Sequence, residues 1–264
     1  MKVLVTGGAG FIGSHIMEAL ITNNYEVVAI DNLSTGHREN LHPDAEFEMV
    51  DIMDAVGLHR IFAKERPDYV IHHAAQISVT QSTKDPFGDA RTNILGTLNV
   101  LECCREFKVK RVVYATSAAI YGSPSYLPVD EEHPICAHSH YGISKHTVQH
   151  YLEVYEAMYG LEYTSLCYAN VYGPRQDATG EGGVIGIFID RLLDGVQPFI
   201  YGDGEQTRDF VYVKDVARAN LLALESTGSH FVNISSNQSI SINSLYHLAK
   251  LRLKPTRVIG VVNK

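Results

Sequence analysis

The stretch VTGGAGFIGSH, residues 5–15, determines how the whole 264-residue chain is interpreted. A short apolar strand pattern ends at Thr6, and a helical pattern follows. Between them lie four glycines: Gly7, Gly8, Gly10 and Gly13. A side chain in such a loop would block the tight turn, the close approach of backbone to a pyrophosphate, and the packing of helix on strand. The stretch therefore predicts a dinucleotide-binding turn, with phosphates at the amino end of the helix.

Strand-like and helix-like segments alternate over the first two thirds of the chain. Short runs rich in β-branched and aromatic residues predict strands at 2–6, 26–31, 47–51, 69–74, 111–116 and 163–168. Helical patterns lie near 11–24, 54–65, 88–107 and 142–159. This order predicts an α/β fold, a Rossmann-type doubly wound parallel sheet whose ligands bind beyond the carboxyl ends of the strands.

The sequence pattern changes after about residue 170. Two Gly-rich loops, NVYGPRQDATGEGG (170–183) and YGDGEQTRDF (201–210), replace the regular alternation. We predict an NAD-binding domain over residues 1–169 and a smaller, shortened substrate-binding lobe over residues 170–264, interleaved with the first domain.

Composition excludes several classes of protein. A formal charge of -8, with no block of Lys or Arg, argues against a nucleic-acid partner. No apolar run approaches the length of a membrane span or a signal peptide, and no histidine spacing is typical of a metal site. Absence of a C-x-x-C pair suggests a reducing compartment, so we expect a cytoplasmic protein. The four cysteines are Cys103, Cys104, Cys136 and Cys167.

An acidic residue follows the glycine loop at the expected distance. Asp31 ends the second predicted strand, 18 residues after Gly13. A carboxylate there can accept hydrogen bonds from an adenosine ribose and would repel a 2'-phosphate, which favours NAD over NADP. Arg38, which can admit a 2'-phosphate, is interpreted as a solvated loop residue. The alternative is a tight packing turn followed by a loop aspartate.

A second constellation lies at the same edge of the sheet. The fifth predicted strand brings Ser117 to its carboxyl end, and HYGISK (140–145) places Tyr141 and Lys145 four residues apart on one face of a helix. A positive charge beside a phenol favours the phenolate, so the pair can act as a tuned base. Taken alone, the pair is also compatible with an ordinary amphipathic helix.

These motifs together resemble a known family. The chain resembles the extended short-chain dehydrogenase/reductases in two motifs, TGGAGFIGSH and YGISK. It resembles their sugar-nucleotide epimerase branch in three more, TSAAIYG, NVYGPR and TRDFVYVKDV. The resemblance implies Tyr141 as the base, Lys145 lowering its pKa, and Ser117 hydrogen-bonding the reacting hydroxyl. It also implies NAD as cofactor. The NAD-binding residues that it implies are Gly7, Gly10, Phe11, Ile12, Gly13, Asp31, Asn32, Asp51, Ile52, Ala74, Ala75, Asn93, Tyr141, Lys145 and Tyr168.

The resemblance also implies a reaction. The expected activity is NAD-dependent epimerisation at C4 of a nucleotide-diphosphate hexose, such as UDP-glucose or UDP-galactose, through a transient 4-keto sugar. Relatives that eliminate water carry an Asp-Glu pair after the Ser/Thr, but here those positions are Ala118 and Ala119. Alanine cannot move a proton, so dehydration is disfavoured, as is the decarboxylation run by relatives that keep a glutamate there.

Substrate contacts are expected from the later part of the chain. Ser117 and Tyr141 should meet the sugar, with Arg208 on the diphosphate and Asn170 beside the pocket. Arg175 and Arg191 are weaker candidates, equally compatible with surface ion pairs. The segment LRLKPTRVIGVVNK (251–264) does not resemble the family, and we expect the lobe to be incomplete there.

Three hypotheses stay open at this point. The first is the UDP-hexose 4-epimerase, and the second is a 4-epimerase of another nucleotide sugar, such as an N-acetylhexosamine or a uronic acid. The third is a non-catalytic NAD-binding protein. Pairing of the helices at 88–107 and 142–159 would form a homodimer, as the family suggests.

Overall fold

The computed structural model describes residues 1–178, 183–253 and 262–263, which form two units. Met1–Tyr168 and Lys214–Ile234 form the first unit, and Ala169–Val213 with Ser235–Lys264 form the second. The chain thus leaves the first unit after its sixth strand and returns to it for one helix and one strand.

A seven-stranded sheet forms the centre of the first unit, in the order β10-β6-β5-β4-β1-β2-β3. All neighbouring strands are parallel. Strand order reverses between β1 and β4, which is the switch point where a doubly wound sheet binds its ligand. This confirms the predicted α/β class. The strands are β1 (Lys2–Thr6), β2 (Glu26–Asp31), β3 (Glu46–Met49), β4 (Tyr69–His72), β5 (Arg111–Ser117), β6 (Glu162–Tyr168) and β10 (His230–Ile234).

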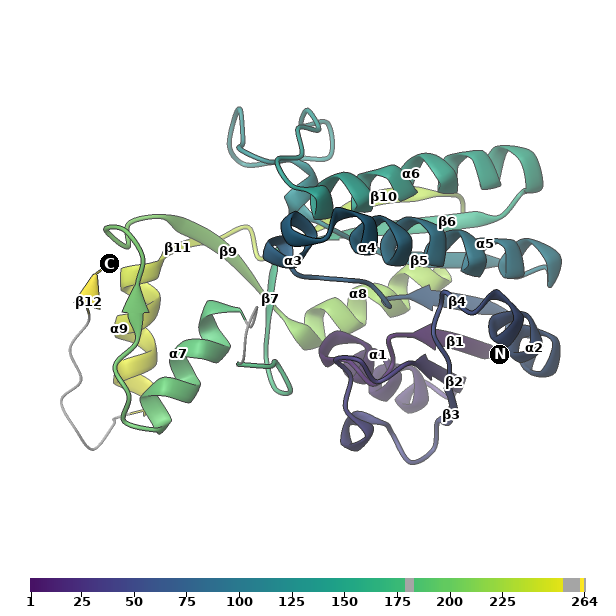
Figure 1. Ribbon diagram of the computed structural model, residues 1–264, viewed down its shortest axis with the longest axis horizontal. Coiled ribbons are helices and arrows are strands. Elements are labelled where there is room, and N and C mark those ends of the chain that lie inside the picture. The colour runs from purple at the N-terminus through teal and green to yellow at the C-terminus, as the bar shows by residue number, and fades with distance from the viewer. Residues whose placement is uncertain (179–182, 254–261, 264) are drawn as a thin grey trace. The chain divides into compact units, whose positions relative to one another are not determined.

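Helices cover both faces of this sheet (Figure 1). One face packs against α2, α5 and α6, through Leu58, Leu101 and Leu152 among others, while α1 and α8 lie on the other face. The 3-10 turns are η1 (Arg38–Asn40) and η3 (Ala118–Ile120). The α-helices of the unit are α1 (Phe11–Thr22), α2 (Ala55–Glu65), α3 (Val79–Lys84), α4 (Pro86–Ala90), α5 (Thr97–Glu106), α6 (His140–Tyr159) and α8 (Val213–Glu225), the last beginning on the final residue of the second unit.

Two features of the first unit differ from the sequence prediction. The single helix expected at 88–107 is broken by a π-helical turn, η2 (Arg91–Gly96), between α4 and α5. The sheet also contains a seventh strand, β10, which was not predicted. The buried Arg111 helps to hold this returning segment, because its guanidinium donates to Ser226 O at 2.7 Å and to Gly228 O at 2.8 Å.

The second unit is smaller. Its three-stranded sheet has the order β11-β9-β7, and its core is built around Phe188, Leu192 and Tyr246. The expected departure from the family at residues 251–264 falls largely on residues 254–261 and 264, outside the described residues. Its elements are β7 (Asn170–Tyr172), α7 (Val184–Leu193), β8 (Phe199–Ile200), β9 (Thr207–Tyr212), β11 (Ser239–Ser241), α9 (Ile242–Leu253) and β12 (Val262–Asn263).

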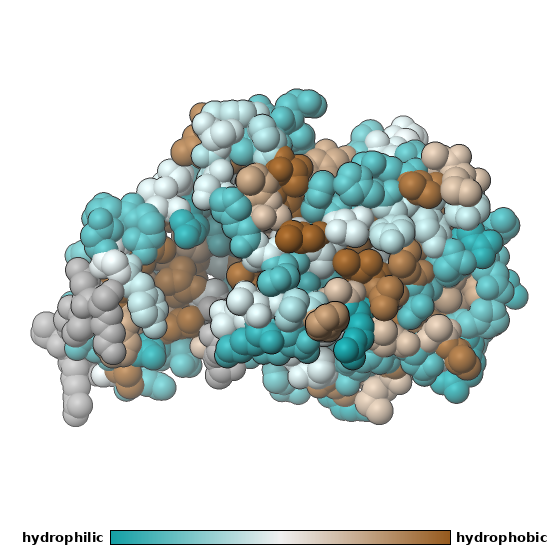
Figure 2. Space-filling model, turned by 45° about the horizontal axis from the view of Figure 1, so that its top comes forward, coloured by the Kyte–Doolittle hydropathy of each residue, from teal (hydrophilic) through white to brown (hydrophobic). Residues whose placement is uncertain are grey.

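The longest helix, α6, has one face in the core and one apolar stripe outside it. Ser139 caps its first turn by accepting from Gly142 N, and Gly160 ends it with φ +67°. Figure 2, which brings the top of Figure 1 forward, shows hydrophobic side chains gathered among hydrophilic ones on the first unit. Ile143, Val154 and Met158 are at least 47% exposed on α6.

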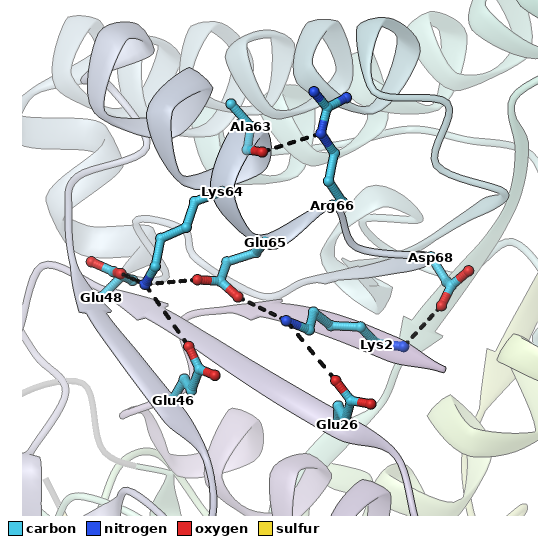
Figure 3. Close-up of polar contacts among 9 residues, drawn as sticks. All are labelled: Lys2, Glu26, Glu46, Glu48, Ala63, Lys64, Glu65, Arg66 and Asp68. Carbon is cyan, nitrogen blue, oxygen red and sulfur yellow. Dashed lines mark hydrogen bonds and ion pairs between the residues drawn. The ribbon is translucent and has the colours of Figure 1, made fainter.

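Charged side chains form a network of ion pairs at the amino ends of the central strands (Figure 3). Glu65, at the end of α2, receives Lys2 Nζ from β1 at 2.9 Å and Lys64 Nζ at 2.8 Å. Lys64 also reaches Glu48 of β3 at 2.8 Å. Burial raises the pKa of Glu65, but the bonds from Lys64 and Lys2 outweigh that effect and the net pKa is lowered. The network ties α2 to two strands.

Candidate functional site

The glycine loop at the end of β1 is packed too closely for side chains. Gly7 has φ +70°, and its amide donates to Ile30 O at 2.7 Å. A Cβ on Gly7 would lie 2.8 Å from Ala74 N, and a Cβ on Gly13 would lie 2.2 Å from Gly7 O. Both contacts are shorter than real Cβ atoms allow, so glycine is required at these two positions.

The amino end of α1 is open to an anion. Gly10 precedes the helix without a side-chain cap, and the first turn, beginning with Phe11 and Ile12, contains no acidic residue. The partial positive charge of the helix end is therefore not neutralised by these side chains. Together with the tight glycine loop, this arrangement fits a dinucleotide diphosphate.

Asp31 lies beside the loop, as the spacing predicts. Its carboxylate accepts from Ala9 N at 3.0 Å and from Leu33 N at 2.8 Å, and it is 8% exposed. A Cβ on Gly36 would lie 2.9 Å from both carboxylate oxygens. An ionised carboxylate has about four acceptor positions, so two remain for ribose hydroxyls.

The neighbouring candidates differ in their contacts. Asn32 Nδ2 donates to Asp51 Oδ2 at 2.8 Å, which links the ends of β2 and β3. Ile52 is buried in the core and packs beneath Gly96. Ala74, after β4, donates its amide to Thr6 Oγ1 at 3.1 Å, and Ala75 follows it.

The expected catalytic triad comes together at the carboxyl ends of β5 and β6. Ser117 ends β5, and its side chain hydrogen-bonds Tyr141 from the first turn of α6. Lys145, one turn further on, is 4% exposed and donates through Nζ to Ala115 O at 2.9 Å. Its ammonium lies 5.0 Å from the centre of the Tyr114 ring, a cation-π contact.

Burial has the largest effect on the protonation of two members of this triad. Burial raises the pKa of Tyr141 to about 12, with the hydrogen bond from Ser117 acting in the opposite direction. Burial lowers the pKa of Lys145 to about 8. The physical reason is desolvation, which disfavours the charged form of each group.

Tyr168 is buried at the end of β6, within a polar cluster. Its hydroxyl lies 3.1 Å from His73 Nε2 and accepts from Asn220 Nδ2 at 2.8 Å. The Tyr168 ring stacks on His73, with 5.6 Å between ring centres. Sequence reasoning missed Asn220, because it lies on the returning helix α8.

Asn93 is fixed by a network that sequence reasoning also missed. It lies in the π-turn, 1% exposed, and contacts Gln76, Asp89 and Ser144. Asp89, Asn93 and Thr97 are polar residues at helical spacing on a buried face. That spacing of polar residues is the sequence feature from which a buried polar network could have been predicted.

The two expected substrate residues both lie in the second unit. Asn170 on β7 donates to Asp209 O at 2.9 Å, and Arg208 on β9 is exposed. Both line a pocket of about 280 Å³ that also includes the aromatic rings of Tyr201 and Phe210. Arg191, a weaker candidate, donates to Gln197 O at 3.2 Å instead.

Two kinds of feature are absent from the described part of the chain. Within residues 1–178, 183–253 and 262–263, no three His, Cys, Asp or Glu side chains are grouped as a metal site would require. In the same part of the chain, every helix is too short or too polar to cross a bilayer.

Comparisons with known proteins agree with this geometry. The sequence model of the NAD dependent epimerase/dehydratase family matches residues 3–235. The chain is 51% identical over 249 residues to a Methanocaldococcus jannaschii protein with a provisional UDP-glucose 4-epimerase name, covering 94% of this chain and 81% of that protein.

Solved structures give the same result. The Thermotoga maritima UDP-glucose 4-epimerase with UDP-glucose matches with a TM-score of 0.96 and 45% identity, over 100% of this chain and 86% of that one. The Methanobrevibacter ruminantium UDP-N-acetylglucosamine 4-epimerase, in complex with UDP-N-acetylmuramic acid, matches with a TM-score of 0.93 and 39% identity, over 100% and 85%. The family match confirms the expected branch and the expected cofactor, and the chain belongs to the NAD-dependent epimerase/dehydratase family.

Proposed function

We propose that this chain inverts the C4 stereocentre of a UDP-hexose, interconverting UDP-glucose and UDP-galactose. The observation that carries the proposal is the hydrogen-bonded pair of Ser117 and Tyr141, with buried Lys145 one helical turn away, at the same sheet edge as the glycine loop. Relatives named UDP-glucose 4-epimerase, described above, support the choice of sugar.

The first unit, corresponding to the predicted domain at residues 1–169, is the proposed NAD-binding part. In this proposal the glycine loop and the amino end of α1 hold the diphosphate, and Asp31 holds the adenosine ribose. NAD bound there would supply the hydride acceptor and donor that inversion at C4 needs. Asn32, Asp51, Ala74 and the other residues that the resemblance implies complete the proposed site.

The proton is handled by the chain itself. Tyr141 in its phenolate form accepts the proton of the C4 hydroxyl as the C4–H bond breaks, which leaves a 4-keto sugar. Ser117, already bonded to Tyr141, is placed to donate to the same sugar oxygen. When the hydride returns to the opposite face of C4, Tyr141 gives the proton back, so the reaction is balanced.

Lys145 provides the positive charge in this scheme. With a pKa of about 8, its amine is mostly protonated at neutral pH, and a cation near the phenol favours the phenolate. Its bond to Ala115 O keeps it beside the end of β5. A fixed cation thus offsets part of the energy needed to ionise Tyr141.

The residues after Ser117 favour this reaction over dehydration. Ala118 and Ala119 form the 3-10 turn η3, and Ala119 N donates to Ser117 Oγ at 3.3 Å. Neither side chain can act as an acid or base toward C5 or C6. Inversion at C4 needs only the tyrosine.

The second unit, Ala169–Val213 with Ser235–Lys264, is the proposed nucleotide-sugar-binding part, and it overlaps most of the predicted lobe at residues 170–264. The Arg208 guanidinium would pair with the diphosphate, and Asn170 would contact the substrate. The aromatic rings in the same pocket suit a pyrimidine base.

Proton NMR tests the proposal. The purified chain is incubated with NAD and UDP-galactose, and the anomeric signal of UDP-glucose is followed. Appearance of that signal supports 4-epimerisation of UDP-hexoses. If NAD is bound but no signal appears, the proposal fails for this sugar.

A second candidate is supported by one observation. The chain is 39% identical to a UDP-N-acetylglucosamine 4-epimerase, so an N-acetylhexosamine remains a candidate substrate. The same NMR assay with UDP-N-acetylglucosamine and UDP-glucuronic acid compares the rates directly. A higher kcat/KM for either sugar would reassign the substrate.

We further propose that the chain forms a homodimer. The exposed apolar stripe on α6, Ile143, Val154 and Met158, together with Leu95 of η2, is the proposed contact. Light scattering after size-exclusion chromatography should give a dimer for the wild type and a monomer for Met158→Lys combined with Val154→Glu. A wild-type monomer would refute the proposal.

We propose a cytoplasmic location because the cysteines form no disulfide bonds. All four are unpaired, and Cys103, Cys104 and Cys167 are buried. Fractionation of the native cells followed by immunoblotting should place the protein in the cytoplasmic fraction.

A further inference from the structure

Asp89 is a buried carboxylate beside the proposed catalytic triad that the mechanism above does not use. It lies on α4 and is 2% exposed. Its Oδ1 accepts from Gln76 Nε2 at 2.8 Å and from Asn93 Nδ2 at 3.1 Å. The carboxylate therefore joins the loop after β4, which carries Gln76, to the π-turn, which carries Asn93.

The network continues to α6. Asn93 Nδ2 donates to Ser144 Oγ at 3.0 Å, and Ser144 Oγ donates to Tyr141 O at 3.0 Å. Ser144 lies directly before Lys145 in the sequence. A single chain of hydrogen bonds thus runs from Asp89 to the helical turn that carries both reactive side chains.

The π-turn explains how Asn93 reaches Ser144. An extra residue in a helical turn re-aims the side chains that follow it, and such turns are frequent at functional sites. Gln76 N donates to Asn93 Oδ1 at 2.8 Å, so both ends of the Asn93 amide are held. The amide has one defined orientation as a result.

The electrostatic environment of Lys145 shows that Asp89 lies near it. Attraction by Asp89 raises the pKa of Lys145, against the larger effect of burial. The other titratable neighbours of Lys145 are His72 and His73, whose pKa values burial lowers to about 3, so both are neutral near pH 7. The ring of Tyr114 also faces it, and burial raises the pKa of the Tyr114 phenol, which is therefore uncharged.

We propose that Asp89 is a positioning residue of this site, holding the first turn of α6 through Asn93 and Ser144 so that Tyr141 and Lys145 are correctly placed. Asp89 does not touch the reacting atoms in this role. The kinetic part of the proposal rests on the proposed 4-epimerase function, whereas the structural part does not.

The kinetic test compares two substitutions in the holoenzyme, with UDP-galactose as substrate. Asp89→Ala should lower kcat by about 10- to 100-fold with little change in KM, because the reacting groups are displaced while substrate contacts remain. Asp89→Asn retains an oxygen that can accept both hydrogen bonds, so its kcat should stay within about threefold of wild type.

The structural test needs no turnover. Hydrogen exchange followed by mass spectrometry should show faster exchange in the peptide spanning residues 140–146 for Asp89→Ala and unchanged exchange for Asp89→Asn. Asp85→Ala is the matched control, because Asp85 caps the same helix α4 through Gly88 N. It should leave both kcat and the exchange of residues 140–146 unchanged.

Three outcomes would overturn the proposal: a kcat for Asp89→Ala within twofold of wild type, an equal loss in Asp89→Asn, or unchanged exchange at residues 140–146. If Asp89→Ala does not fold, Ser144→Ala removes the last link and is judged by the same criteria. If the wild type does not turn over UDP-galactose, the proposed function fails, and hydrogen exchange alone decides the role of Asp89.

Discussion

At the amino ends of the central strands, charged groups form ion pairs with each other, whereas at the carboxyl ends they are buried and hydrogen-bond to neutral groups. Lys2 and Arg111, at the starts of β1 and β5, bind the carboxylates of Glu65 and Glu162. Lys145, at the other end of β5, bonds a backbone carbonyl.

The groups at the amino ends of the strands contribute to stability, whereas those at the carboxyl ends are the ones proposed to carry the chemistry. Pairing lowers the pKa of Glu65 and keeps it ionised, while burial lowers the pKa of Lys145 to about 8 and raises that of Tyr141 to about 12. Both shifts are costs of desolvation, so the carboxyl ends of the strands give up stability at groups that the proposed chemistry needs. Each of the following changes affects one end of the strands.

The largest expected effect comes from Tyr141→Phe at the carboxyl end. Loss of the general base should lower kcat by about 10³-fold. The melting temperature should stay close to the wild-type value, because the aromatic ring and its packing are retained and only the hydroxyl is lost. NMR of UDP-galactose turnover and a thermal melt measure both quantities. Activity within tenfold of wild type would remove Tyr141 as the base.

A methyl group at Gly13 should abolish detectable NAD binding. Its Cβ would lie 2.2 Å from Gly7 O, so the loop must move away from the phosphates. Titration calorimetry with NAD measures the loss in Gly13→Ala. Gly186→Ala is the control, because its nearest contact would be 3.6 Å. Equal NAD affinity in the two variants would contradict the proposed role of the loop.

Low pH should reduce the free energy of unfolding through His72, which lies at the carboxyl end of β4. This residue is 1% exposed, and burial lowers its pKa to about 3 from an ordinary value of 6.5. The unfolded chain binds a proton below about pH 6.5 and the folded protein does not, so stability is full above that pH and falls as pH decreases toward 3. The loss is about 1.4 kcal/mol per pH unit.

Urea unfolding between pH 7 and pH 5 measures this slope. His72→Asn should reduce the slope but not remove it, because burial also lowers the pKa of His73 to about 3 and that residue contributes in the same direction. His150→Gln should leave the slope unchanged, because the His150 side chain is 65% exposed. A slope that His72→Asn leaves unchanged would assign the acid sensitivity to other groups.

The smallest expected effect is at the amino end. Glu65→Gln should lower the free energy of unfolding by about 1–2 kcal/mol, because two lysines lose their buried counter-charge. Its kcat should not change. Glu26→Gln is the control: its carboxylate is 74% exposed and 4.0 Å from Lys2, so almost no effect is expected. A loss of turnover in Glu65→Gln would contradict the separation of the two ends.

The sequence predicted the parts of the structure that depend on local pattern. The glycine loop, Asp31, and the pairing of Ser117 with Tyr141 follow from the spacing of short motifs next to strands. β10 was missed because it joins the sheet only after the chain has formed the second unit, and it pairs with β6 across more than 60 residues.

The network around Asp89 could not be predicted for a similar reason. Its links join residues 13 and 51 positions apart, through Gln76 and through Ser144. The π-turn that aims Asn93 depends on packing against α6, and local helix propensity does not encode it. The protonation of Lys145 likewise depends on burial, which appears only once the fold is formed.

The most direct test of the account is isotopic. UDP-galactose deuterated at C4 is incubated in ordinary water with the wild-type protein and NAD, and the UDP-glucose formed is analysed by NMR and mass spectrometry. The account predicts that deuterium remains at C4, because the hydride leaves and returns within the site while Tyr141 handles only the hydroxyl proton. Replacement of that deuterium by solvent hydrogen would contradict it.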